Sequence, residues 1–549
     1  MSYLSTKEIA QTNLLSKTWK NNLRPSFPVL AFNHELFAAK GESEPYWYLR
    51  RTHWGRPEKY TQSMDDFTRH VNATLVNFCE CEANLKMLKF ELYIGIYYNN
   101  YWSGLVDKWI KLALENHVGD LELGFWLFER GLYPLPETIF FATSLTRLSL
   151  RRCKLNHPNP NNAAAPFNFQ SLEILTLMEV CLDELMIHKL TSDSPMLNYI
   201  AIWDCKGFKH CHLAKLERLK TLVINLRLTF PLGQVLNSIE VEEAPNLEYC
   251  TIDCTNMVGP SSISSLFNCN RMRELSLSGN LITDQVFDSL FSKIFPLLEE
   301  FKLENSNILR RINISSQRLK QLKIHNCQGL EAIHIDTPNL HGFLYSGNLV
   351  PIASIKAPCP GKFTAIMERR VNTLWYLNLK KLLMGNSKHE ELLTSRILLR
   401  EHSYNSYEFR QSSPSPPCEI QKLTLGVFKI PESEYGAVLD AHLSICYPKT
   451  LCLFINGARV HGVNGVQVQR ADGFCMFLYQ ILSRREAYRC DCSYVHCWRH
   501  YLKRMTRITI IKSQSPREEV LVLEGDALMN AGPDHLKGKI VYFDLEWCF

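Results

Sequence analysis

The apolar positions in the middle of the chain follow a repeated frame. From residue 145 onward the same order recurs: an apolar residue, two variable residues, a second apolar residue, one variable residue and a third apolar residue. The segment 145–155 fits the full leucine-rich pattern, with Cys153 at the position that the pattern gives to Asn or Cys. The frame returns eight more times, starting at Leu172, Leu197, Leu219, Leu247, Met272, Leu298, Leu319 and Leu340.

The spacing of this frame predicts a repeat architecture. Successive starts lie 27, 25, 22, 28, 25, 26, 21 and 21 residues apart, all within the leucine-rich-repeat period of about 20–29 residues. The alternative is a set of unrelated buried strands in an α/β domain, which would bring nucleotide or phosphate motifs that this sequence lacks. One repeat cannot bury its own apolar face, so stacked repeats share a continuous core. We therefore predict an α/β fold, a leucine-rich-repeat solenoid of horseshoe form.

The residues around the predicted strands indicate turns, helices and earlier repeats. An Asn or Cys at the turn can donate to backbone carbonyls that the bend would leave unpaired. Residues 283–294 place apolar side chains on one helical face, which predicts a helix on the convex side. Elsewhere between the strands we expect helical or irregular structure, and a loop at 156–167. Weaker copies of the frame begin at Leu85 and Val118, so the solenoid is expected over 36–350, with clear repeats from 145.

Beyond residue 350 the period is lost. Residues 351–417 are interpreted as the end of the repeats and a linker rich in proline and serine, and 418–549 as a small C-terminal α+β module. In this module we expect strands at 421–427, 450–454 and 507–511 and a helix at 474–485.

Composition narrows the class of partner. The 549 residues exceed what one globular core holds, and 46% apolar with 21% charged residues is typical of a folded protein. The formal charge of +6 is small for this length, which argues against a nucleic-acid partner.

No stretch approaches the ~18 uncharged apolar residues of a membrane span, and no signal peptide is recognised. We expect the cytoplasm or nucleus, with the 19 cysteines as free thiols.

The sequence carries no catalytic signature that we recognise. It has no nucleophile elbow, P-loop, dinucleotide glycine pattern or His-Glu-x-x-His motif, so we expect neither an enzyme nor a cofactor. The densest group of metal-ligating side chains has residue types that could bind zinc, but its spacing is not that of known zinc sites. We expect no metal there and favour a helix with Trp498 and Tyr501 packed inside. The members of this group are Cys490, Cys492, His496, Cys497 and His500.

The concave face of the sheet is the candidate binding surface. Side chains alternate along a strand, so the variable positions of each frame point away from the core. These positions would change from basic through aromatic to acidic along the array, unless an insertion or the C-terminal module covers them. Tyr and Trp are favoured at the energetic centres of protein interfaces, which makes Tyr199 and Trp203 the strongest candidates. The predicted partner-binding residues are Arg147, Arg151, Tyr199, Trp203, Glu274, Glu300, Glu304 and Lys323.

Several segments resemble a known plant family. The run from Leu4 to Trp19, including Leu-Leu-Ser-Lys-Thr-Trp, together with Phe-Pro-Val-Leu at 27–30, looks like the second half of a plant F-box. Residues 106–110, and 135–140 leading into the first clear repeat, are similar to segments of the plant F-box/LRR-repeat family. Residues 446–451 and 497–503 resemble a C-terminal region of some members.

The resemblance implies a function. Members of the family act as substrate receptors of SCF-type cullin–RING ubiquitin ligases: the F-box binds the ligase adaptor, and the repeats select the protein to be ubiquitinated. Residues 1–35 would then be a partial, N-terminally truncated F-box-like helical segment, because the Leu-Pro helix that opens a complete F-box has no counterpart here. The alternative function is a leucine-rich-repeat interaction scaffold without ligase docking. The adaptor-binding residues that the resemblance implies are Leu4, Leu14, Leu15 and Trp19.

Overall fold

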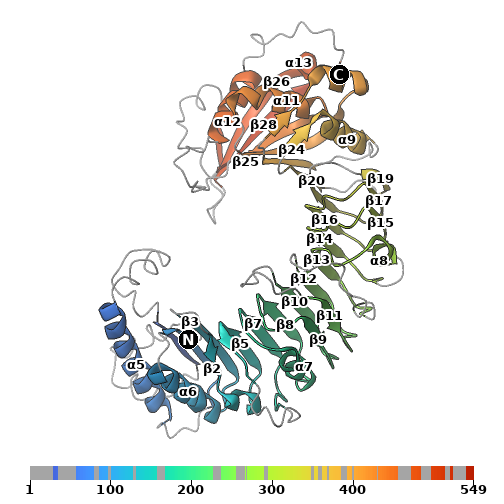
Figure 1. Ribbon diagram of the computed structural model, residues 1–549. Coiled ribbons are helices and arrows are strands. Elements are labelled where there is room, and N and C mark those ends of the chain that lie inside the picture. Colours follow the sequence, from blue (N-terminus) through green and yellow to red (C-terminus); the bar gives the residue numbers. More distant parts are fainter. Residues whose placement is uncertain are drawn as a thin grey trace. The chain divides into compact units, whose positions relative to one another are not determined.

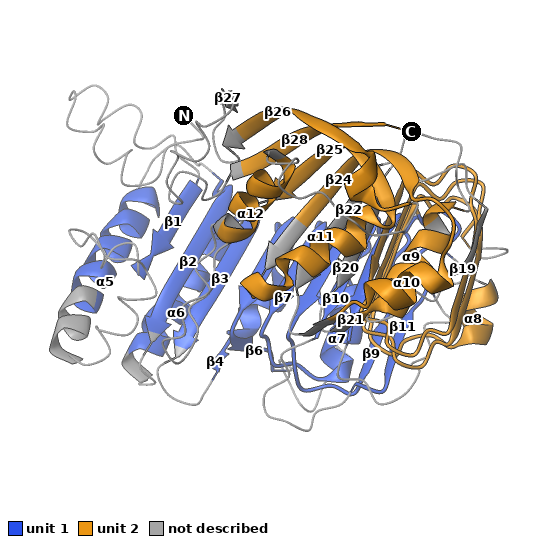
Figure 2. Cartoon of the chain, turned by 90° about the horizontal axis from the view of Figure 1, so that it is seen from above, with its two compact units in different colours: residues 1–272 blue, residues 273–549 orange. Residues whose placement is uncertain are grey.

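The chain divides into two compact units, residues 1–272 and 273–549, shown in blue and orange in Figure 2. The computed structural model describes residues 29–34, 57–79, 86–96, 100–127, 132–156, 167–226, 236–254, 266, 269–289, 295–347, 352–356, 362–367, 370–384, 392–398, 401–428, 431–454, 471–483, 496–512, 520–523 and 539–548.

The first unit is built on a parallel sheet whose strands follow chain order (Figure 1). Each strand pairs in parallel with the next, and the printed pairings between β1 and β12 show no slip of register. Equivalent positions of successive repeats therefore lie side by side in straight rows. The strands are β1 (Val29–Asn33), β2 (Lys89–Ile96), β3 (Asp120–Leu127), β5 (Arg147–Arg151), β7 (Ile174–Met178), β8 (Tyr199–Trp203), β10 (Thr221–Asn225) and β12 (Tyr249–Asp253).

The second unit contains another parallel run, followed by an antiparallel end. The parallel strands are β13 (Glu274–Ser278), β14 (Glu300–Glu304), β16 (Gln321–His325), β18 (Gly342–Ser346), β20 (Lys362–Met367), β22 (Leu392–Leu398), β24 (Cys418–Phe428) and β25 (Cys446–Phe454). Strand β25 then pairs antiparallel with β28 (Lys539–Trp547), β28 with β26 (Leu502–Lys512), and β26 with β27 (Val520–Leu523).

The predicted solenoid is confirmed. All nine frames from residue 145 form a strand that begins two residues after the first apolar position, as β5 begins two residues after Leu145. The second and third apolar positions point inward: Leu148 and Leu150 are each 1% exposed, and in the second unit Phe301 and Leu303 are 1% and 0% exposed. The weaker frame at Val118 forms β3. The frame expected to begin at Leu85 is displaced by two residues: β2 begins two residues after the buried Met87, and Leu88, expected to point inward, is 59% exposed. The protein is a leucine-rich-repeat solenoid of the α/β class.

The segments between these strands differ from the prediction of helical or irregular structure, because several form a second parallel ladder. In β15, Ile312 and Ile314 are buried and alternate with exposed residues, a two-residue period that a search for one strand per repeat overlooks. The pairs are β4 (Tyr133–Pro134) with β6 (Cys153–Lys154), β9 (His210–Leu213) with β11 (Ser238–Val241), β15 (Arg311–Ser315) with β17 (Ala332–Asp336), β17 with β19 (Ile352–Lys356), and β21 (Arg370–Asn372) with β23 (Glu401–Ser403).

Helices occupy other return segments. In the first unit, α5 (Pro57–Cys79) and α6 (Asn100–Glu115) lie together next to β2 and β3 (Figure 1), and the buried Trp109 of α6 donates to Asn72 of α5 at 2.7 Å. A 3-10 helix, η3 (Glu137–Phe141), and α7 (Glu184–Ser192) follow. The helix expected at 283–294 is described as α8 (Asp284–Ser289); residues 290–294 lie outside the described residues.

The parallel pairing continues beyond residue 350, where the sequence period had led us to expect the array to end. By register, Gly342 aligns with Lys362, then with Leu392, Lys422 and Thr450. From Lys362 onward these aligned residues are 30, 30 and 28 apart, because helices fill the repeats, and this obscures the period. The helices between these strands are α9 (Thr373–Met384), α10 (Ser406–Ser412), η6 (Glu432–Glu434) and α11 (Tyr435–Leu443). Helices α12 (Ala471–Ser483) and α13 (Trp498–Tyr501) follow β25.

The elements predicted within 418–549 are present as β24, β25, α12 and β26, but β24 and β25 belong to the parallel run. Residues 413–417, at the end of the segment expected to be the repeat end and linker, join α10 to β24 of the same run. Assignment of 418–549 to a separate module stays a prediction. Among the helices that the structure describes, none combines the length and apolarity needed to cross a bilayer.

Candidate partner-binding surface

The outward positions of the first unit form rows across the sheet. One row aligns Arg147, Ile174, Tyr199, Thr221 and Tyr249, each paired with the next. Two more rows lie parallel to it, one starting at Ser149 and one at Arg151. Because the register does not slip, side chains that are about 25 residues apart in sequence become direct neighbours. The candidate surface is therefore a two-dimensional array set by the strands.

The middle of this surface is aromatic and almost free of charge. We call Ile174, Met178, Tyr199, Trp203 and Tyr249 the aromatic patch. Tyr249 is 38% exposed and the other four are half-buried. On β7, β8, β10 and β12, which are described in full, the one charged residue among the twelve outward positions is Asp253, and its side chain is buried. Such a surface loses little hydration when a partner covers it.

The basic residues predicted next to this patch are paired. Arg147 Nε lies 3.5 Å from Asp120 Oδ2, and Arg151 Nη2 lies 3.7 Å from Glu179 Oε1. The Arg151 guanidinium also lies 5.8 Å from the centre of the Trp126 ring, within cation–π range. The structure therefore puts Arg147 and Arg151 on the outward face, as predicted, within a mixed-charge border.

A second set of pairs lies on β2 and β3. Lys89 Nζ is 2.8 Å from Glu91 and 3.0 Å from Glu122; burial lowers the pKa of Lys89, but these two contacts outweigh it and raise the pKa. Tyr93 donates to Glu122, and burial together with this hydrogen bond raises the pKa of the phenol. The Tyr93 ring lies 5.6 Å from that of Trp126. The sequence frame did not reveal Tyr93 and Trp126, because it covers only the first part of β2 and β3, which are eight residues long.

The predicted acidic residues of the second unit also lie on outward positions, among lysines. Lys302 Nζ is 3.0 Å from Glu304, and Lys323 Nζ is 4.0 Å from Glu300. Glu274 lies on β13 with much of its side chain exposed. Its pKa is raised, first by the partial burial of the carboxylate and second by repulsion from Glu300. The local charge is therefore more balanced than the predicted gradient from basic to acidic.

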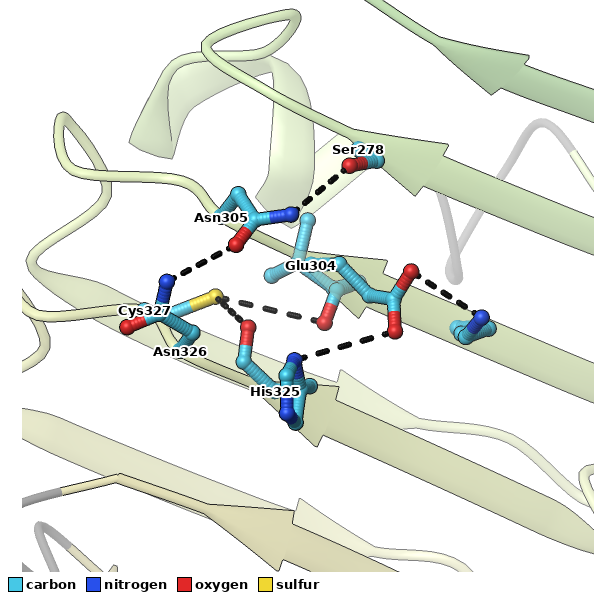
Figure 3. Close-up of polar contacts among 8 residues, drawn as sticks. Ser278, Glu304, Asn305, His325, Asn326 and Cys327 are labelled. Carbon is cyan, nitrogen blue, oxygen red and sulfur yellow. Dashed lines mark hydrogen bonds and ion pairs between the residues drawn. The ribbon is translucent and has the colours of Figure 1, made fainter. Parts of the chain in front are cut away.

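Tight turns at the strand ends hold these rows in place. Asn305 and Asn326, each directly after a strand, have φ of 54° and 51°, a left-handed conformation that Asn tolerates better than most residues. Their backbone N–H groups donate to the last carbonyl of the following strand, at 2.9 Å to His325 and 2.7 Å to Ser346. Asn326 Nδ2 donates to Asn305 Oδ1 at 2.8 Å, and Asn305 Nδ2 to Ser278 Oγ at 3.1 Å (Figure 3).

The same turn appears in the first unit with charged residues. Arg152 (φ 56°) and Glu179 (φ 54°) follow β5 and β7, and Arg152 Nε pairs with Glu179 Oε2 at 2.7 Å. The predicted donor role of the Asn/Cys position is seen at Cys327, whose Sγ lies 3.5 Å from the His325 carbonyl. Asn280 instead accepts from the backbone N–H of Asn307. Neighbouring turns therefore bond to each other as well as to the strands.

Two other predicted groups remain untested. Leu4, Leu14, Leu15 and Trp19 lie outside the described residues, as do Cys490 and Cys492. Cys497 is buried at the start of α13, Trp498 is 3% exposed, and Tyr501 is half-buried, in keeping with a packed helix. His496 and His500 are described, but the group cannot be compared as a whole, and the expectation that it binds no metal stays a prediction.

Buried thiols in the described part of the chain are poor candidates for nucleophiles. Burial raises the pKa of Cys205 and Cys211 to about 12, so the reactive thiolate is scarce near neutral pH. Burial also raises the pKa of Cys153, and of Cys446 in the second unit.

Comparison with known proteins gives matches in the repeats. The family model for the LRR repeats of FBD-associated F-box protein At5g56370 matches residues 106–266. The model for the LRR domain of At1g61320/AtMIF1 matches residues 249–384. Together the two matched segments include most strands of both parallel runs.

Curated relatives are from Arabidopsis thaliana. The chain is 23% identical over 228 residues to F-box/LRR-repeat protein At3g03360, which is 41% of this chain and 44% of the relative. It is 24% identical over 260 residues to F-box/LRR-repeat protein At4g14096, which is 45% and 46% of the two chains. The chain is also 27% identical over 209 residues to "Putative F-box/LRR-repeat protein At3g44810", which is 38% of this chain and 41% of the relative. The chain thus spans less than half the length of these three relatives. The repeat region of this chain is similar to the repeat regions of plant F-box/LRR-repeat proteins.

Proposed function

We propose that this chain is a non-enzymatic recognition subunit that holds a protein partner on the aromatic patch. The observation that carries the proposal is the uncharged patch of Tyr199, Trp203 and their neighbours on the outward rows of a register-locked sheet. Large aromatic side chains in a pre-ordered setting gain contact area with little loss of conformational entropy. The paired charges around Arg147 and Arg151 would then orient the partner and exclude mismatched ones.

We further propose that the bound partner is a substrate, and that the chain delivers it to an SCF-type ubiquitin ligase. Support comes from the F-box/LRR-repeat names of the relatives and from the F-box resemblance of residues 1–35. In this scheme Leu14, Leu15 and Trp19 contact the ligase adaptor. The chain itself supplies binding and positioning, and the ubiquitin transfer chemistry resides in the other subunits.

Co-purification with the adaptor tests the ligase role. The full chain is co-expressed with a plant SCF adaptor protein, beside a variant carrying Leu14→Ala, Leu15→Ala and Trp19→Ala. Recovery of the adaptor with the parent chain and its loss with the variant are expected. Failure of the parent chain to retain the adaptor, with partner binding preserved, would make the protein an interaction scaffold without ligase docking.

A separate comparison tests the patch. Proteins recovered with the parent chain from plant cells are quantified against those recovered with a Tyr199→Ala, Trp203→Ala variant. A matched control, Arg218→Ala, changes an exposed residue in the segment after β9. The proposal expects a partner that is lost with the patch variant and kept with the control; equal loss or equal retention would contradict it.

A further inference from the structure

The second ladder of the first unit brings together a group of metal-ligating side chains. Strands β9 and β11 pair in parallel, with His212 directly opposite Glu240. Glu242 follows two residues later on the same side, and its N–H donates to the Leu213 carbonyl at 2.8 Å, which extends the ladder. One ligand atom from each of His212, Glu240 and Glu242 can be chosen such that all three lie within 4.8 Å of one another. We call these three residues the His–Glu cluster.

The ring of His212 lies between Glu242 and His188. His212 Nε2 lies 3.2 Å from Glu242 Oε1, has almost no contact with solvent, and makes no hydrogen bond of good geometry. On its other side the ring stacks on His188 of α7, with centroids 4.8 Å apart and 30° between the planes. His188 Nδ1 is likewise shielded from solvent and without a hydrogen-bond partner. His212 therefore presents an imidazole nitrogen without a good hydrogen bond beside the two carboxylates.

The geometry assigns different roles to the two rings. An imidazole binds a metal ion through a lone pair in its own plane, and nearly parallel stacked rings cannot direct both lone pairs at one ion. His212 faces the carboxylates, so His188 acts as a positioning residue that fixes the ring orientation, as outer groups do at metal sites. The side chains of His212 and Glu242 are 37% and 55% exposed, which leaves an open side for ion entry and for water ligands.

The chemistry of the cluster matches one class of ion. A neutral imidazole with two carboxylates carries a net charge of −2 and suits a divalent cation. Imidazole nitrogen disfavours Mg²⁺ and Ca²⁺, which prefer all-oxygen sites, and favours Zn²⁺ and its neighbours in the transition series. We propose that His212, Glu240 and Glu242 bind a divalent transition-metal ion such as Zn²⁺ on the second ladder. The ion ties β9 to the segment containing β11.

This site is separate from the proposed partner surface. The aromatic patch uses the outward rows of β7, β8, β10 and β12, whereas the cluster belongs to the β9–β11 ladder. Loss of metal binding therefore leaves the proposed partner binding in place, and the reverse also holds.

Titration of the full chain with Zn²⁺, followed by calorimetry, tests the proposal. His212→Ala and Glu240→Gln each remove one ligand and are expected to weaken the site by about 10-fold or more, judging from the 10–100-fold effect of changing even outer residues at metal sites. The control Glu217→Gln neutralises an exposed carboxylate elsewhere in this unit and is expected to change nothing. Circular dichroism of each variant checks that the fold is kept.

Co²⁺ distinguishes this site from the cysteines. Cobalt bound to nitrogen and oxygen lacks the near-ultraviolet thiolate charge-transfer band, so the absorption lost in His212→Ala should contain none of it. His188→Phe keeps the ring stacking and should retain binding, whereas His188→Ala should weaken it. The proposal is overturned if Zn²⁺ affinity and stoichiometry are the same in the parent chain, His212→Ala and Glu240→Gln. It is also overturned if all bound Co²⁺ shows thiolate ligation, and a loss in His188→Phe as large as in His212→Ala overturns the assignment of roles.

Discussion

The left-handed turn at Asn326 offers a sharp test of how the repeats are held together. Asn326 has φ of 51° and donates from its side chain to Asn305 at 2.8 Å; its Oδ1 accepts from the exposed amide of Gln328 at 3.2 Å. Its backbone N–H bonds to the Ser346 carbonyl whatever the side chain. Substitution therefore separates two contributions, the side-chain hydrogen bond and the cost of the backbone conformation.

The expected losses of stability follow from these contacts. Loss of the partly buried hydrogen bond to Asn305 costs about 1 kcal/mol. Alanine also lacks the polar side chain that makes the left-handed region accessible, which adds about 1 kcal/mol, so Asn326→Ala should lose about 2 kcal/mol. Asn326→Gly loses the hydrogen bond without the steric penalty, although its greater freedom in the unfolded chain offsets part of that gain. We expect it to fall between the parent chain and the alanine variant.

Urea denaturation followed by circular dichroism measures these differences, provided that the slope of the transition is unchanged. Because long repeat arrays can unfold in parts, hydrogen exchange at the amides of Asn305 and Asn326 supplies a local measurement. Gln328→Ala is the control and should stay within about 0.5 kcal/mol, since it removes one exposed contact. Equal stability of the glycine and alanine variants would refute the proposed backbone strain, and parent-like stability of both would refute the role of the ladder.

Three further outcomes are expected. Phe301→Ala empties a core position that is 1% exposed and should cost about 3–5 kcal/mol in urea denaturation, whereas Lys302→Ala on the outward side should cost less than about 1 kcal/mol; similar losses would contradict the assigned facing. Burial lowers the pKa of Lys380 to about 8, so the folded state binds fewer protons than the unfolded state from there to the ordinary lysine value. Stability measured against Lys380→Met should therefore rise with pH across that window and be constant below it; a flat difference would contradict the burial of a charged amine. In folded protein, iodoacetamide should label the exposed Cys79 well before Cys205, whose pKa burial raises to about 12, and mass spectrometry showing equal rates would contradict the packing.

The sequence predicted the strands of the main sheet because their spacing is imposed by burial. Every repeat must direct apolar side chains into the shared core at equivalent positions. The positions of Leu148 and Leu150 are therefore apolar in each repeat, and this regular spacing is visible in the sequence. The outward facing of Tyr199 and Trp203 followed from alternation along the strand. The neighbours of these two residues in the patch could also be predicted, because a constant register places equivalent positions of successive strands side by side.

Other features could not be read in this way. The second ladder depends on short alternations such as Ile312 and Ile314, which are too brief to stand out. The His–Glu cluster joins His212 to Glu240, 28 residues later, through a register that was not expected. The later repeats contain helices such as α9, which lengthen them and obscure the period. The pairing of charges around Arg151 depends on residues of neighbouring strands and turns, and therefore on the folded arrangement.

The central claim is that the outward rows of the first unit hold a protein partner, and photo-cross-linking tests it most directly. Benzoylphenylalanine is placed at Tyr249, which is 38% exposed within the aromatic patch, or at the exposed Lys215 beside the second ladder. The two chains are irradiated in plant cells, with and without Trp203→Ala. We expect a discrete adduct from position 249 that disappears with Trp203→Ala and is absent from position 215. An adduct that forms equally at both positions, or that is unaffected by Trp203→Ala, would contradict it.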